Sequence, residues 1–296
     1  MVNRRRFAAL ILGASLARAD DRLEVGGAEI DVSLKPADFD LPPDTLMNWV
    51  KESARAVSRY FGKFPVPHAR IQMVQGRRSG VMSGRTFGAG GAHTRIAVGQ
   101  HTTVADLKDD WVMTHEMVHY GFPSVEDRHH WMEEGSATYV EPIARARIGQ
   151  LTPQRVWGDM IRDMPQGLPR SSDQGLNNTH TWGRTYWGGA IFCLLADVGI
   201  RKHSGNKQGL EDALRAINQA GGTIEVDWPL TRALEIGDNA TGGTVLADLY
   251  RNLGSKPVAV DLADLWNQLG VSRNGSEVTF NDRAPLAAIR SAILGQ

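Results

Sequence analysis

Two histidines with an acidic residue between them constrain the fold of this chain more than any other feature. The segment reads His115-Glu116-Met117-Val118-His119. Side chains four residues apart lie one above the other on an α-helix, so both imidazoles can reach one Zn²⁺ ion. Glu116 lies about 100° around the helix, where it can serve as general base toward a water molecule at the metal. The pattern therefore predicts a helix that carries part of a zinc-hydrolase site.

Apolar residues surround this motif at positions that would bury the helix. Trp111, Val112 and Met113 precede it, and Met117 and Val118 lie within it. This pattern is typical of an active-site helix packed into a core. The alternative is an amphipathic helix with two histidines at the surface, which requires no metal.

A second helix, expected to begin near Trp131, carries the adjacent acids Glu133 and Glu134. A buried helix has little reason to hold two adjacent acids unless one of them faces a positive charge. A zinc ion on the histidine pair would supply that charge. Two histidines and one carboxylate leave the fourth zinc position open for water, which is the arrangement of a catalytic site.

The two segments together resemble the gluzincin metallopeptidases, in which an HExxH helix is followed by a helix with a W-x-x-E-G-x-x-x-Y-like motif. Residues 131–139 read WMEEGSATY. The resemblance implies that His115, His119 and Glu134 bind one Zn²⁺ per chain and that Glu116 is the general base. It also implies that Thr138 supports one of the ligand histidines.

The connector between the two helices departs from this family. Fourteen residues separate His119 from Glu134, fewer than in the M1 aminopeptidases and thermolysin-like enzymes. Loop length affects stability weakly, so the same site can form, but the register stays open and Glu133 is an alternative third ligand. The metzincin pattern does not apply, because its glycine and third histidine are missing.

A third segment, residues 185–215, is similar to the M61 glycyl aminopeptidases. That family and the M1 peptidases carry a tyrosine just before a helix that starts with small residues, and Tyr186 matches this position. The resemblance implies that its hydroxyl stabilises an oxyanion, which a phenol can do at neutral pH without ionising. The alternative is a tyrosine packed beside Trp182 and Trp187.

The residues before the motif predict a small mixed α/β lobe. We expect a helix over residues 43–64 and neighbouring strands over 69–75 and 92–98. A Gly-rich loop is expected at 76–91, with 88–91 lying where the sheet edge would pair with an extended substrate. A flexible surface hairpin is the alternative. M1 aminopeptidases hold a free amine with an acid near here, and this chain has none, so the endo or exo mode stays open.

The expected fold is α+β, a thermolysin-like zincin core. Its mixed lobe would span residues 20–124 and end in the HExxH helix. A mainly helical lobe, residues 125–296, would carry Glu134 and Tyr186, with short helices expected at 230–234, 242–253, 262–269 and 284–294.

The N-terminus predicts export. Three arginines at positions 4–6 precede a short apolar stretch, so residues 1–19 resemble a bacterial signal peptide. The Arg-Arg-x-Phe core resembles a twin-arginine signal, and an ordinary Sec signal is the alternative. Either one predicts a periplasmic or secreted protein. The apolar stretch is too short to span a bilayer, so no stable membrane insertion is expected after the signal is removed.

Composition gives no reason to expect nucleic acid or an anionic membrane as a partner, and the family resemblance implies a peptide or protein substrate. Lys plus Arg and Asp plus Glu number 33 each, so no excess charge favours nucleic acid or an anionic membrane. The single cysteine, Cys193, excludes an intrachain disulfide and is expected to pack in an apolar helix. His129, His130 and His180 are expected at the surface.

The sequence therefore predicts a zinc metallopeptidase with catalytic residues Glu116 and Tyr186. Two other classes stay open. One is a catalytically silent relative that binds peptides or cell-wall fragments. The other is a zinc hydrolase that acts on a non-peptide bond.

Overall fold

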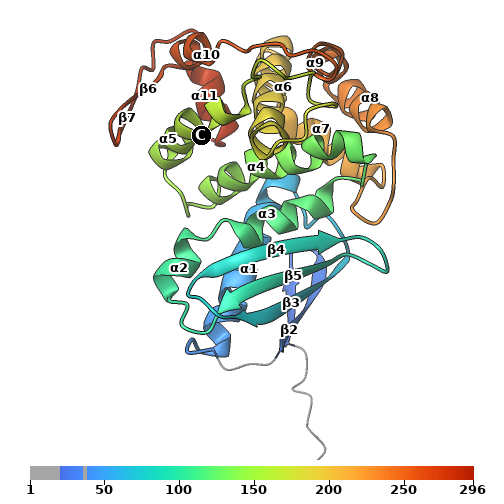
Figure 1. Cartoon of the computed structure of the whole chain (residues 1–296), viewed down its shortest axis with the longest axis vertical. Coiled ribbons are helices and arrows are strands. Elements are labelled where there is room, and N and C mark those ends of the chain that lie inside the picture. Colours follow the sequence, from blue (N-terminus) through green and yellow to red (C-terminus); the bar gives the residue numbers. More distant parts are fainter. Residues whose placement is uncertain (1–20, 36–38) are drawn as a thin grey trace, which may run out of the picture.

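The structure is a computed structural model that describes residues 21–35 and 39–296. The export signal predicted at residues 1–19 lies outside these residues, so export stays a prediction. Figure 1 shows a sheet lobe and a helical lobe, with α3 (Val112–Val118) and α4 (His130–Ala146) where the two lobes meet. The predicted α+β architecture is confirmed.

A five-stranded sheet forms the first lobe, in the order β1-β2-β3-β5-β4. The strands are β1 (Asp21–Val25), β2 (Ala28–Lys35), β3 (His68–Gly76), β4 (Val81–Phe87) and β5 (His93–Gly99). β3 pairs in parallel with β2 and β5, whereas β4 pairs antiparallel with β5 and lies at the sheet edge. The two strands expected from the sequence are therefore neighbours.

The expected loop at residues 76–91 is wrong, because it contains strand β4. This strand reads VMSGRTF, and its polar residues and central glycine do not alternate with apolar ones. Residues 88–91 form the turn between β4 and β5 and not the edge itself. Strands β1 and β2 were also not anticipated.

Helix α1 (Pro43–Phe61) confirms the expected first helix and lies behind the sheet in Figure 1. The short α2 (Val104–Asp109) leads into α3, whose seven residues are all buried. A 3-10 turn, His119–Gly121, continues α3 and ends it. The HExxH motif is therefore fixed in the core between the sheet and the helical lobe.

Helices dominate the second lobe. They are α4, α5 (Pro153–Asp163), α6 (Gly189–His203), α7 (Leu210–Gln219), α8 (Leu230–Thr241), α9 (Val245–Leu253), α10 (Leu262–Leu269) and α11 (Ala287–Ile293). The four short helices expected after residue 229 are present. A hairpin of β6 (Val271–Asn274) and β7 (Glu277–Phe280) was not expected; its strands are short and mostly exposed. The lobe boundary at residue 124 stays a prediction.

Helices α4 and α6 cross at glycines. A Cβ atom built on Gly135 of α4 would lie 2.3 Å from the Cα atom of Gly189 at the start of α6. Because only glycine permits this approach, the crossing fixes α4, and with it Glu134, against the segment that carries Tyr186.

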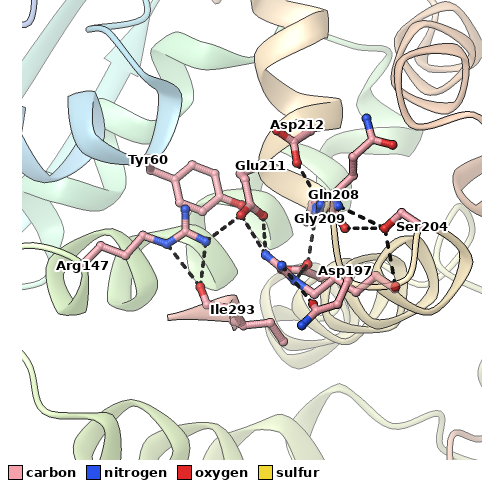
Figure 2. Close-up of polar contacts among 12 residues, drawn as sticks. Tyr60, Arg147, Asp197, Ser204, Gln208, Gly209, Glu211, Asp212 and Ile293 are labelled. Carbon is pink, nitrogen blue, oxygen red and sulfur yellow. Dashed lines mark hydrogen bonds and ion pairs between the residues drawn. The ribbon is translucent and has the colours of Figure 1, made fainter. Parts of the chain in front are cut away.

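A buried ionic network, drawn in Figure 2, joins the helices of this lobe. Arg201 contacts Asp197 and Glu211, each at 2.7 Å. Arg147 donates to Glu211 at 2.9 Å and to the carbonyl of Ile293 at 2.7 Å. Two positive and two negative charges balance, so the network ties α4, α6, α7 and α11 together without an uncompensated buried charge.

No helix in the described part of the chain is long and apolar enough to cross a membrane.

Candidate metal centre

The three predicted zinc ligands converge at the junction of the lobes. His115 lies on α3, His119 at its C-terminal end and Glu134 in the second turn of α4. One ligand atom from each lies within 4.8 Å of the others. The Oε2 atom of Glu134 is 3.1 Å from Nε2 of His115 and 3.7 Å from Nε2 of His119. The structure thus brings all three side chains to one point.

The electrostatics of this group fit a metal ion. Burial lowers the pKa of His119 to about 4, which keeps its imidazole neutral, as a metal ligand must be. Burial works against ionisation of Glu134, but hydrogen bonds from His115 and His130 hold the pKa of its carboxyl well below its usual range. The neutral imidazole of His119 and the ionised carboxylate of Glu134 fit the donor set of an open zinc site.

The side chain of Glu116 extends from α3 to the edge strand β4. The hydroxyl of Thr86 donates to Glu116 Oε2 at 2.7 Å, and burial raises the pKa of the Glu116 carboxyl. A Cβ atom on Gly84 would lie only 2.5 Å from Cγ of Glu116. The edge strand therefore packs directly on this side chain, and a glycine makes the approach possible.

Sequence reasoning missed both Gly84 and Thr86. They belong to the strand that was read as a loop, so their partner across the fold was not foreseen. Only the recognition of β4 as an edge strand beside the motif helix would have identified them.

Tyr186 lies beside the ligand group, in a π-helical turn, Arg184–Gly188, that leads into α6. Its ring is 6.1 Å from the ring of His115, and the two planes are within 18° of parallel. On its other side it stacks on Trp182 at 5.5 Å. Burial, followed by the charge of Glu134, raises the pKa of Tyr186 to about 12, so its hydroxyl stays a hydrogen-bond donor at neutral pH.

Glu133, the alternative ligand, does not join the group that contains His115, His119 and Glu134. Its Oε1 atom accepts a hydrogen bond from the backbone N–H of Val125 at 2.8 Å. Of the two adjacent acids, Glu134 is therefore the one that faces the histidines.

Thr138 does not form the bond to a histidine that the family resemblance implied. Its buried hydroxyl has no hydrogen-bond partner among the described residues, and the same is true of Nδ1 of His115. Both residues line the cavity beside the metal centre.

The three histidines expected at the surface differ in their environments. His180 is exposed. His129 is buried, and its Nε2 atom is 2.8 Å from the Tyr250 hydroxyl, so the expectation for His129 is wrong. His130 is half-exposed but reaches the metal centre, with Nε2 3.3 Å from Oε1 of Glu134. Its spacing of four residues from Glu134 on a helix was the sequence signal for this contact.

The carboxylates of Glu133 and Glu134 raise the pKa of His130. Its Nδ1 atom is 2.8 Å from Oε2 of Glu133. Hydrogen bonds to Glu133 and then Glu134 raise the pKa of His130 to about 10.

A cavity of about 300 Å³ opens beside His115, one of the three converging side chains. Its wall includes His115 and Thr138 and the aromatic side chains of Trp111, Trp182, Tyr186 and Trp187. Charged side chains in the wall pair with one another, as Arg145 does with Glu141 at 2.8 Å. The cavity therefore has an apolar, aromatic wall, and its volume can hold about one large side chain.

No protein-family model matches this chain, and no curated protein sequence matches it. Solved structures do match. An aminopeptidase N family protein from Idiomarina loihiensis aligns with a TM-score of 0.63 and 13% identity, over 85% of this chain and 49% of that one. An M1 zinc metallopeptidase from Deinococcus radiodurans aligns with a TM-score of 0.53 and 16% identity, over 83% of this chain and 52% of the other.

A mutant of the Deinococcus radiodurans enzyme bound to a Tyr-Ser-Ala substrate aligns with a TM-score of 0.52 and 15% identity, over 82% of this chain and 52% of the other. This chain spans about half the length of these structures. At such low identity the likeness shows the fold, which is that of the M1, gluzincin-like zinc metallopeptidases.

Proposed function

We propose that this chain, which has the fold of the M1 zinc metallopeptidases, is a zinc-dependent peptidase. The observation that carries the proposal is the convergence of His115, His119 and Glu134 beside two groups suited to hydrolysis. Those groups are the carboxylate of Glu116 and the hydroxyl of Tyr186. In this proposal the chain binds one zinc ion through the three converging side chains.

The bound zinc would supply a Lewis acid that polarises the peptide carbonyl and activates water. Glu116 accepts a proton from the attacking water and passes it to the departing amine. Its burial raises its pKa, which favours a carboxyl group that both accepts and returns a proton. Tyr186 donates a hydrogen bond to the oxyanion that develops on the carbonyl oxygen.

The edge strand supports a peptide as the substrate. Among the described strands β4 pairs with β5 alone, so its other side can add an extended peptide as a further strand. Glu116 packs against this strand, which sets the general base beside the backbone of a peptide bound there. The aromatic cavity would receive one large side chain of that peptide.

The test combines zinc content with cleavage of a mixed peptide library by wild type and by Glu116→Gln. We expect about one zinc per chain in both proteins and cleavage by the wild type alone, because the amide binds no proton at neutral pH. The cleavage products would also distinguish endopeptidase from aminopeptidase action.

Two results would contradict the proposal. If the purified wild-type protein contained no zinc, the proposed metal site would be wrong. Zinc without cleavage in either protein would favour a silent binding protein, and turnover limited to non-peptide substrates would favour the other hydrolase class.

A further inference from the structure

His130 links the two acids at the start of α4. Its Nδ1 atom is 2.8 Å from Oε2 of Glu133, and its Nε2 atom is 3.3 Å from Oε1 of Glu134. Oε1 is the oxygen of Glu134 that does not contact His115 or His119, since both of these lie nearest Oε2. The two oxygens of Glu134 therefore face different histidines.

We infer that His130 is a positioning residue for the metal centre, which holds Oε1 of Glu134 so that Oε2 alone faces His115 and His119. The inference rests on the proposed function, because it assigns the metal to these three side chains. A glutamate side chain has several rotatable bonds, and ordering it costs conformational entropy. A partner on the outer oxygen removes that freedom before a metal binds, as outer partners of metal ligands do.

His130 is itself anchored from the other side. Glu133 holds its Nδ1 atom and also accepts the backbone N–H of Val125 at 2.8 Å. The adjacent Ser124 exchanges backbone hydrogen bonds with the chain near residue 227: it donates to Val226 at 3.0 Å and accepts from Trp228 at 2.9 Å. An unbroken series of contacts therefore runs from the helix connector through Glu133 and His130 to Glu134.

This series of contacts gives a role to Glu133, the acid of the pair that does not face His115 and His119. Glu133 fixes the connector and the imidazole, whereas Glu134 faces the histidines. The connector holds only fourteen residues between His119 and Glu134, and its attachment to Glu133 sets the start of α4 relative to α3. The short connector and the orientation of the third ligand thus depend on the same two side chains.

His130 is a positioning residue and not a fourth ligand in this arrangement. It is absent from the group of described residues whose ligand atoms lie within 4.8 Å of one another. Its side chain is 53% exposed, so its replacement leaves little buried space and should not disturb the packing of α4.

The experiment measures zinc affinity of the full chain by competition with a chromophoric chelator. For His130→Ala we expect zinc affinity to fall about 10- to 100-fold, the range typical of lost outer partners. His130→Gln keeps one donor and should recover part of the loss, and Glu133→Gln should show a smaller loss than His130→Ala. His180→Ala, a change at an exposed histidine far along the chain, is the matched control and should bind zinc like wild type.

A second readout separates positioning from a general structural role. The absorption spectrum of bound Co²⁺ should differ between wild type and His130→Ala, because the orientation of Glu134 changes, whereas His180→Ala should match wild type. Equal zinc affinity in the two proteins would overturn the inference and leave the proposed function intact, and a Co²⁺ spectrum of His130→Ala identical to that of wild type would overturn it in favour of a general structural role. A wild type that binds no zinc would instead overturn the proposed function, and the inference with it.

Discussion

At the scale of single residues, the position of Glu116 depends on a hydroxyl and on a missing side chain. Thr86 binds one carboxylate oxygen, and Gly84 leaves the space that the Glu116 side chain occupies. Val112 borders the same space, since its Cγ1 atom would lie 2.8 Å from a Cβ atom on Gly84. A methyl group at position 84 therefore has to displace a neighbour.

Gly84→Ala should lower kcat/KM by about 100-fold, because a shift of about 1 Å in a catalytic group has an effect of that size. Zinc content should not change, because the atoms nearest to a Cβ atom on Gly84 belong to Glu116 and Val112 and not to the proposed ligands. Peptidase kinetics and metal analysis test this, with Ser83→Ala, an exposed change on the same strand, as the control. Activity close to that of wild type would show that Glu116 can move without loss of function.

Tyr186→Phe tests the oxyanion role at the same scale. Loss of one hydrogen-bond donor to a developing oxyanion lowers kcat by about 100- to 1,000-fold. The ring and its stacking on Trp182 remain, so KM should change little. Steady-state kinetics on one peptide give both constants, and a rise in KM at constant kcat would assign Tyr186 to substrate binding instead.

At the scale of elements, the crossing of α4 and α6 positions Glu134, which is the third zinc ligand under the proposed function. Gly135→Ala would place a methyl group 2.3 Å from the backbone of Gly189. We expect the free energy of unfolding to fall by about 1–3 kcal/mol, as overpacking does, and zinc to bind more weakly because Glu134 is the adjacent residue. Urea denaturation and zinc competition measure the two effects.

Gly158→Ala in α5 is the matched control for this change. Its Cβ atom would meet only the side chain of Val278, at 2.8 Å, and that side chain can move. The gain in helix propensity, about 1 kcal/mol, should offset the contact. Equal stability losses in the two variants would show that the crossing has no special role.

Elements were predictable from the sequence where they carry periodic apolar residues or a chemical motif. The helices that hold His115 and Glu134 were predicted from both, and the helix at residues 43–61 from its spacing. Strand β4 was missed because an edge strand needs only one buried face, and this one has polar residues and a glycine in its centre. The contact of His130 with Glu134 was missed because the second helix was expected to begin near Trp131, whereas α4 begins one residue earlier, at His130.

At the scale of the whole molecule, the network around Arg201 holds the helical lobe together. Arg201→Met would leave Asp197 and Glu211 with less compensation in a buried environment. Loss of one partner from a buried ionic group costs about 3–5 kcal/mol, so the free energy of unfolding should fall by that amount. Arg162→Met, at an exposed ion pair, should change it by about 1 kcal/mol or less. Urea denaturation compares the two, and similar values would show that the network is dispensable.

The π-helical turn at Arg184–Gly188 determines what the loss of one residue would do to this part of the site. Such a turn contains one residue more than an α-helical turn. Loss of that residue would restore a regular helix and rotate the residues before it by about 100°, which would turn Trp182 and its stacking surface away from Tyr186. Under the proposed function, the loss of a single codon at this point would therefore remove the stacking partner of the oxyanion donor.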